Sequence, residues 1–203
     1  TLSDAEIEEH YNPRIAVPDY LSHFAKVQDM SAAARAHLTS RLDLRYGDGP
    51  LETFDLFPAT SPNAPIHIFI HGGYWRALDK SDYSFMAESL VAAGAMVITL
   101  NYDLCPAVTL DKLVDEVRRG IAYVARNAED LGGDADRIFL SGHSAGAHLS
   151  AMAIAHDWTT DGLPADLIKG VVLATGIYDP APVLRVSTNA EIGLTAEMAE
   201  RNN

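Results

Sequence analysis

One serine is placed where its hydroxyl could act as a nucleophile. Ser144 is the central residue of a G-x-S-x-G pattern at 142–146, which follows the apolar run 138–140 and precedes an alanine-rich stretch. A strained turn between a strand and a helix lifts such a hydroxyl clear of the sheet, and the flanking glycines let neighbouring backbones approach. The bare pattern also occurs in ordinary turns. Because a strand precedes it and a helix follows, we interpret this segment as a nucleophile elbow.

A second motif supplies groups that such a nucleophile needs. The β-rich apolar run 66–70 ends in His71-Gly72-Gly73-Tyr74-Trp75. In the α/β-hydrolase fold, the loop after this strand provides one or two backbone N–H groups of the oxyanion hole. Glycines suit that role because they let the main chain come close to a substrate oxygen. A plain turn with a packed aromatic pair is the alternative, but the loop precedes the elbow in the chain, as the fold requires.

The elements around these motifs alternate between strand and helix. Residues 1–40 indicate helical decoration, and 42–46 and 51–57 alternate apolar and polar residues around the turn 47–50, which predicts an antiparallel hairpin at a sheet edge. The later alternation predicts a single α/β domain over 1–203, with a mostly parallel central sheet and helices on both faces. We expect strands at 66–70, 95–100, 137–141 and 171–174, and helices near 80–93, near 109–131 and from the elbow to about 157.

Composition narrows the classes of function. The chain has 203 residues, 48% hydrophobic and 21% charged, which is ordinary for a globular domain. Its formal charge of −13, with only 15 Lys and Arg, argues against nucleic acid as a partner. We expect a cytoplasmic protein without a signal peptide or membrane span. The lone Cys105 agrees with a reducing compartment and indicates a packed loop position rather than a nucleophile.

The partners of a serine triad are not evident. In this fold the acid and then the histidine follow the serine, yet only His148 and His156 come after Ser144, and a packed or capping role suits both better than that of a base. His143 and His71 also favour structural roles, and Asp179 is a weak candidate for the acid because it comes one strand early. We therefore expect the natural protein to continue beyond Asn203, and the strand 171–174 to be left at an unpaired edge.

Three motifs of this sequence together resemble those of a known family. The segments 71–75, 142–149 and 101–106 (Asn-Tyr-Asp-Leu-Cys-Pro) resemble those of the α/β-hydrolase-type arylformamidases, also called kynurenine formamidases. The resemblance runs from about residue 60 to the end and extends to 157–159, 176–179 and 187–189. The related hormone-sensitive-lipase branch usually carries H-G-G-G and Y-R-L-A-P. Tyr74-Trp75 and Asp103 differ from that pattern and resemble the formamidases instead.

The resemblance implies a reaction and a set of roles. Ser144 would attack the formyl carbon of N-formyl-L-kynurenine, and the N–H groups of Gly73, Tyr74 and Ala145 would hold the oxyanion. Tyr74 and Trp75 would wall a tight acyl side, and His71 is also expected beside the substrate. The family's acid and histidine would lie beyond Asn203. No metal or organic cofactor is implied; the expected partner is a small-molecule substrate, neither nucleic acid nor a membrane is expected as a partner, and a homodimer is left open.

Two alternatives remain at the level of the sequence. A carboxylesterase acting on small acyl or aryl esters would use the same elbow and loop. A non-catalytic binding protein of the same fold is the alternative from another class, if 203 residues are the whole gene product.

Overall fold

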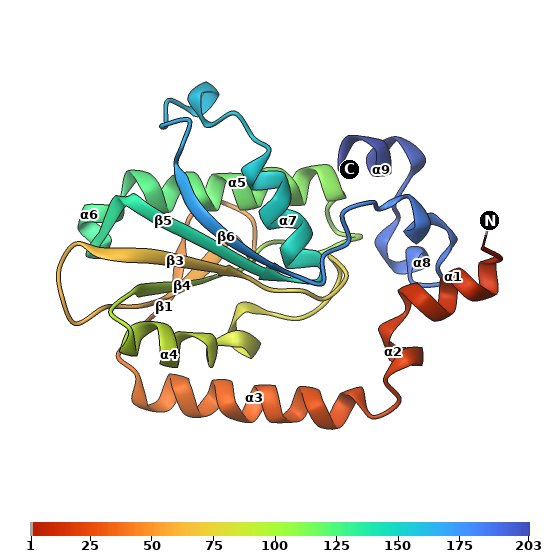
Figure 1. Cartoon of the computed structure of the whole chain (residues 1–203), viewed down its shortest axis with the longest axis horizontal. Helices are drawn as coiled ribbons and strands as arrows, with labels where there is room; N and C mark the ends of the chain where they lie inside the picture. The colour runs from red at the N-terminus through yellow and green to blue at the C-terminus, as the bar shows by residue number, and fades with distance from the viewer. Residues whose placement is uncertain (1) are drawn as a thin grey trace.

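The computed structural model describes residues 2–203 and has a central six-stranded sheet (Figure 1). The strands lie in the order β1-β2-β4-β3-β5-β6. The pairs β4–β3, β3–β5 and β5–β6 are parallel, whereas β1–β2 and β2–β4 are antiparallel. This is the mostly parallel sheet with an antiparallel hairpin at its edge that the sequence predicts. The strands are β1 (Arg41–Arg45), β2 (Thr53–Phe57), β3 (Ala64–Ile70), β4 (Met96–Leu100), β5 (Gly133–His143) and β6 (Ile168–Ala174).

Helices cover both faces of the sheet. Figure 1 shows α5 and α7 on one face and α4 with α3 on the other. One face of α5 is buried in the core, where it contributes Leu110, Leu113, Val114, Val117, Ile121 and Val124. The helices are α1 (Asp4–Tyr11), α2 (Pro13–Ala16), α3 (Tyr20–His37), α4 (Met86–Ala92), α5 (Leu110–Arg126), α6 (Ala128–Leu131), α7 (Ala145–Ile154), α8 (Asn189–Ile192) and α9 (Ala196–Arg201), with 3₁₀ turns η1 (Lys80–Tyr83), η2 (Trp158–Asp161) and η3 (Ala181–Arg185).

Three predicted elements differ in detail. The helix expected over 80–93 is divided into η1 and α4, and η1 begins with a capping box in which Asp79 and Asp82 bond each other's backbone. The helix expected over 109–131 ends at Arg126, and α6 follows as a separate turn. The second strand of the expected hairpin, at 51–57, begins at Thr53, and all five residues of β2 are buried although the segment alternates apolar and polar residues.

β6 lies at the other edge of the sheet. Within the described residues it pairs only with β5. Val172 is 65% exposed and Val171 is 38% exposed, so this strand presents apolar side chains and an open edge, as the sequence predicts for 171–174.

The N-terminal part of the chain forms helices that run along the body. Apart from Thr1, which lies outside the described residues, the expected helical character of 1–40 is seen in α1, α2 and α3. In Figure 1, α3 lies below α4, while α1 lies beside α8 near the other end of the chain. Within residues 2–203, no helix has the length and apolar character needed to cross a membrane.

Candidate active site

Ser144 occupies a strained backbone position between β5 and α7. Its φ of 55° and ψ of −120° are rare for a residue with a side chain, and the cost of roughly 1–3 kcal/mol persists only where the surroundings impose it. The Ser144 N–H donates to the Ala174 carbonyl oxygen on β6 (2.8 Å), and its carbonyl oxygen accepts from Ala147 and His148 at the start of α7. The turn therefore has the elbow geometry that the sequence pattern predicts.

Close packing explains the two glycines of the elbow. A Cβ atom on Gly146 would lie 2.0 Å from the Ile70 carbonyl oxygen, and one on Gly142 would lie 2.2 Å from the Gly146 carbonyl oxygen. Side chains cannot approach backbone atoms so closely. Only glycine therefore allows α7 to begin directly against the end of β3, from which the 71–75 loop departs.

The 71–75 loop lies against the elbow. A Cβ atom on Gly72 would lie 2.9 Å from the His143 carbonyl oxygen and 3.2 Å from the Ser144 Cβ atom. Gly73 has a φ of 110°, and a Cβ atom there would lie 1.9 Å from the Ala77 carbonyl oxygen. The sequence-predicted nucleophile and oxyanion loop are thus neighbours, and the loop has no room for a side chain at either glycine.

Three backbone N–H groups near Ser144 are free to act as donors. Within the described residues, the N–H groups of Gly73 and Tyr74 make no hydrogen bond. Ala145 is the first residue of α7, a position whose N–H has no acceptor inside the helix. These are the groups that the resemblance assigns to an oxyanion hole. The arrangement can stabilise a negative oxygen that develops beside Ser144.

Trp75 and His71 hold this loop rather than contact substrate. Trp75 has no exposed surface; its Nε1–H donates to His148 Nδ1 (3.2 Å), and its carbonyl oxygen accepts from Cys105 N–H (2.8 Å). These contacts help to fix Tyr74 and Trp75 at the unusual φ values of 54° and 58°. The expectation that Trp75 walls the substrate is not met, because its ring packs into the core and does not line the cavity described below.

The expectation that His71 lies beside the substrate is not met either. Its ring is fully buried, donates from Nε2 to Asn101 Oδ1 (2.9 Å) and stacks on Tyr102 with the ring centres 4.3 Å apart. Burial lowers the pKa of the His71 ring. Asn101 in turn donates to Asp79 Oδ2 (2.7 Å). His71 therefore ties the loop to the end of β4 and to η1, and it lies too deep to touch a substrate.

The other histidines are also committed to structure or lie outside hydrogen-bond reach of the serine. His148 Nε2 donates to the Asn202 carbonyl oxygen (2.8 Å), and burial lowers the pKa of its ring. His156 pairs with Asp161 Oδ2 (2.6 Å). Within residues 2–203, no histidine nitrogen makes a hydrogen bond with Ser144 Oγ. Asp179 caps the turn at Ala181 through Oδ1 (2.9 Å) and meets no histidine.

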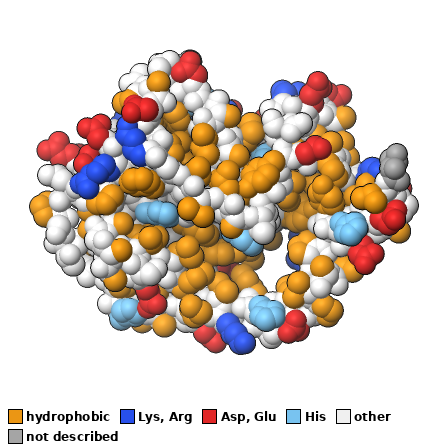
Figure 2. Space-filling view, in the orientation of Figure 1, with side chains coloured by type: hydrophobic (Ala, Val, Ile, Leu, Met, Phe, Trp, Pro, Cys, Tyr) orange, Lys and Arg blue, Asp and Glu red, His pale blue; other side chains and the backbone are white. Residues whose placement is uncertain are grey.

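A large apolar cavity lies in front of Ser144. Its volume is about 910 Å³. One wall is formed by Ser144 with its neighbours and by Gly73 and Tyr74, and the facing wall is formed by α2 and the first half of α3, including Tyr20 and Phe24. Figure 2 shows the molecule hollowed between this N-terminal segment and the body, with hydrophobic side chains around the opening. Such a cavity is suited to a largely apolar small molecule.

The sequence reasoning missed the facing wall. Residues 1–40 were interpreted as decoration, yet Tyr20, Phe24 and Val27 line the cavity from α3. Their spacing of four and three residues places them on one helical face, which is a signal that the sequence does contain. What could not be read from the sequence is that this face turns toward the elbow.

Cys105 agrees with its expected structural role. Its side chain is 4% exposed, and burial raises the pKa of the thiol to about 11. The thiolate is therefore disfavoured at neutral pH, and Cys105 is not a competing nucleophile.

Comparisons with known proteins identify the family. A family model described as BD-FAE matches residues 55–164. The kynurenine formamidases of Danio rerio and Salmo salar are 34% and 35% identical to this chain, with 100% of the chain matched and 70% of each relative covered. The chain belongs to the kynurenine formamidase family. It is accordingly an enzyme of the hydrolase class, which favours catalysis over the alternative of a non-catalytic binding protein.

Solved structures agree with membership of the kynurenine formamidase family. A structure from Silicibacter sp. TM1040 is 29% identical and has a TM-score of 0.85, covering 98% of this chain and 74% of the other. The carboxylesterase EstE1 from a metagenomic library, at 22% identity and a TM-score of 0.61, covers 80% of this chain and 56% of its own and supports the fold alone. The predicted α/β-hydrolase fold is confirmed.

Proposed function

We propose that this protein hydrolyses N-formyl-L-kynurenine to L-kynurenine and formate. The observation that carries the proposal is the similarity of the whole chain to two kynurenine formamidases. The geometry supports it, because one strained serine, three free backbone donors and an apolar cavity meet at the carboxyl end of the parallel strands.

The chemistry follows from these groups. The Ser144 hydroxyl attacks the formyl carbon as a base accepts its proton, and the N–H groups of Gly73, Tyr74 and Ala145 bind the oxygen that becomes negative. Collapse of this intermediate breaks the C–N bond and releases the aryl amine, which receives a proton. Water then attacks the formyl ester on Ser144 and releases formate. The N–H donors need no side chain, so the hole is already formed before the substrate arrives.

The cavity suits a small acyl group joined to a large aromatic amine. Gly72 brings the backbone of the 71–75 loop close to Ser144, which favours formyl, the smallest acyl group. The remaining volume, faced by Tyr20, Phe24 and Tyr83, can hold an aromatic leaving group by apolar and ring contacts.

Carboxylesterase activity is the second candidate. Isoprenylcysteine methylesterases of Oryza sativa and Arabidopsis thaliana are 32–35% identical to this chain, although the matches cover only 55–60% of it. The same serine and oxyanion loop serve esters equally well. The two candidates differ in the leaving group, an aryl amine or an alcohol.

A comparison of substrates on the intact protein decides between them. We expect kcat/KM for N-formyl-L-kynurenine to exceed that for 4-nitrophenyl acetate, which has the more reactive acyl bond but lacks the formyl group and the larger leaving group. Higher kcat/KM for the acetate ester, with only trace hydrolysis of the formyl amide, would contradict the formamidase and support the esterase.

A further inference from the structure

The charged residues of the Ser144 cavity have one sign. Arg14 on α2 and Arg76, just after the oxyanion loop, both line it, and none of the described residues that line it is Asp or Glu. The chain as a whole has a net charge of −13, with 28 acidic residues against 15 basic ones. A cavity lined by two arginines and no carboxylate is therefore unlike the chain's overall composition, and it favours a negatively charged group on an entering molecule.

Arg76 is held close to the reacting groups with donor capacity to spare. Its N–H donates to the Gly73 carbonyl oxygen (3.1 Å), so the residue is fixed to the oxyanion loop. The side chain is only 11% exposed, Nη1 contacts Glu191 Oε2 at 2.7 Å, and Nε is buried without a hydrogen-bond partner. A guanidinium offers five N–H donors. Glu191, which is 61% exposed, engages only Nη1, so the other N–H donors of Arg76 leave it able to bind a second carboxylate.

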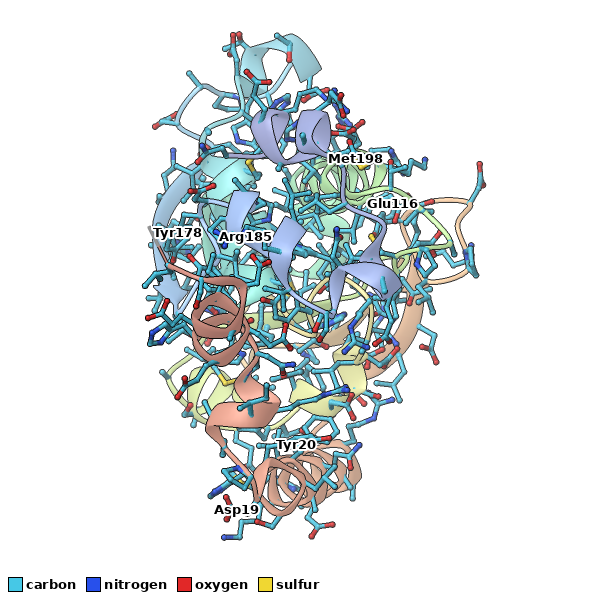
Figure 3. All side chains as sticks on the ribbon, turned by 90° about the vertical axis from the view of Figure 1, so that its right-hand side faces the viewer. Asp19, Tyr20, Glu116, Tyr178, Arg185 and Met198 are labelled. Carbon is cyan, nitrogen blue, oxygen red and sulfur yellow. The ribbon has the colours of Figure 1, made fainter. Side chains whose placement is uncertain are left out.

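Arg14 presents a second cation from the facing wall. Its guanidinium lies 5.7 Å from the centre of the Tyr20 ring, a contact that restrains the side chain without consuming its hydrogen-bond donors. Within residues 2–203, the guanidinium makes no hydrogen bond or ion pair. Tyr20, labelled in Figure 3, is the first residue of α3, and Arg14 belongs to α2, so their contact lies where α2 passes into α3. Arg14 and Arg76 thus reach the same cavity from its two opposite walls.

We propose that Arg14 and Arg76 form an anion-recognition subsite that binds a carboxylate carried by the leaving-group side of the substrate. This inference rests on the proposed function, since it names the substrate class as formyl arylamines that bear a carboxylate. Guanidinium groups bind carboxylates through paired, charge-assisted hydrogen bonds. The subsite selects formyl amides that carry a carboxylate over those that lack one, whereas the oxyanion loop and Ser144 treat both alike.

A matched pair of substrates differs only at the amino-acid end that carries the carboxylate. N-formyl-L-kynurenine and 2′-formamidoacetophenone share the formamide, the aromatic ring and the neighbouring carbonyl, but the second compound lacks the amino-acid end. On the intact protein, we expect Arg14→Gln and Arg76→Gln each to lower kcat/KM for N-formyl-L-kynurenine about tenfold to one hundredfold, mainly through KM. The same variants should change kcat/KM for the neutral analogue less than about threefold, and Arg76→Lys should recover part of the loss.

Arg185→Gln is the matched control. Arg185, labelled in Figure 3, also pairs with an exposed carboxylate of another segment, donating from Nε to Asp4 Oδ1 (2.6 Å), but it does not line the cavity. We expect this variant to leave the preference between the two substrates unchanged. Equal losses on both substrates in the Arg14 and Arg76 variants, or no loss on either, would overturn the subsite.

Binding of the product separates this inference from the proposed function. Calorimetry should show that L-kynurenine binds the wild-type protein more tightly than 2′-aminoacetophenone, and that Arg14→Gln with Arg76→Gln removes the difference. Equal affinities in the wild-type protein would reject the subsite. If neither formyl amide is hydrolysed yet the difference in binding is present, the proposed reaction fails and the carboxylate subsite stands.

Discussion

The two walls of the cavity are built by different means. The catalytic wall, formed by the elbow 142–146 and the loop 71–75, depends on backbone conformation and on glycines that leave no room for side chains. The facing wall, formed by α2 and the first half of α3, contributes side chains such as Tyr20 and Phe24. In the proposed reaction, the Ser144 hydroxyl and main-chain groups fixed by the sheet carry out the chemistry, whereas side chains of the facing wall select among substrates.

The walls also differ in how they are attached. The catalytic wall continues directly from β3 and β5 in the core. The facing wall is fastened at its two ends: Ser31 on α3 donates to the Asp82 carbonyl oxygen (2.6 Å), and Arg35 forms an ion pair with the buried Asp55. At the other end, Tyr74 Oη donates to the Tyr11 carbonyl oxygen (2.7 Å). The segment between these anchors spans the cavity and can vary in sequence without disturbing the sheet.

The largest effect is expected from the nucleophile itself. Ser144→Ala should lower kcat/KM for N-formyl-L-kynurenine by about 10⁴-fold or more, because no other group of the catalytic wall can form the acyl intermediate. The fold should persist, as measured by circular dichroism and thermal unfolding. Ser141→Ala is the control, since Ser141 also lines the cavity but is not at the elbow. Comparable losses in both variants would remove the special role of Ser144.

A smaller effect is expected from the oxyanion loop. Gly73→Val should raise the barrier by roughly 2.7–4 kcal/mol, seen as a loss in kcat, because a side chain at a φ of 110° would collide with the Ala77 carbonyl oxygen. Tyr74→Phe keeps the backbone donor and removes only the hydroxyl that bonds to Tyr11, so it should change KM more than kcat. Equally mild effects of both substitutions on kcat would argue against Gly73 as a donor position.

Changes in the facing wall should affect binding without affecting chemistry. Phe24→Ala removes apolar contact area from the cavity and should raise KM roughly threefold to thirtyfold with kcat nearly unchanged. Met30→Ala lies on the same helix but outside the cavity, where Met30 is 50% exposed, and it should alter neither constant. A large fall in kcat for Phe24→Ala would show that the facing wall contributes to the chemical step and not only to substrate binding.

A change outside both walls should alter stability alone. Glu116 on α5 is fully buried, accepts a hydrogen bond from Asp103 N–H (2.9 Å), and has its pKa raised from 4.5 to about 6, first of all by burial. A raised acid pKa means that the folded state holds the proton more tightly, so this group lowers the unfolding free energy as pH rises from about 4.5 to about 6, and the penalty persists at higher pH.

Glu116→Gln cannot ionise and should escape that penalty. The stability of the variant relative to the wild type should therefore increase by roughly 1–2 kcal/mol between pH 4.5 and pH 7, as measured by chemical denaturation at several pH values, with kcat/KM unchanged. A relative stability that is constant or falls over this range would show that burial does not raise the pKa of Glu116.

The catalytic wall could be predicted from the sequence because its requirements are local. An apolar strand, two glycines and a serine in register define the elbow, and the same reasoning found the loop 71–75. The roles of Trp75 and His71 could not be predicted in the same way. Both residues have the chemistry of a substrate contact, and only tertiary packing against His148 and Asn101 shows that they are anchors.

The facing wall could not be placed because its partners are far away in the chain. The contacts that position α3 include one between Arg35 and Asp55, which are 20 positions apart, and one between Ser31 and Asp82, which are 51 positions apart. The aromatic face of α3 can be recognised from the sequence. The direction in which that face points cannot, because it is set by contacts with distant residues. Likewise, the helix predicted over 80–93 is interrupted at 84–85, between η1 and α4.

Covalent labelling tests the central claim most directly. An excess of a fluorophosphonate on the intact protein, followed by peptide mapping by mass spectrometry, should modify Ser144 in one stoichiometric event and abolish hydrolysis of N-formyl-L-kynurenine in parallel. Stoichiometric labelling at another residue, such as Ser141 or Tyr74, or full activity after Ser144 is modified, would contradict the assignment of the reaction to the elbow.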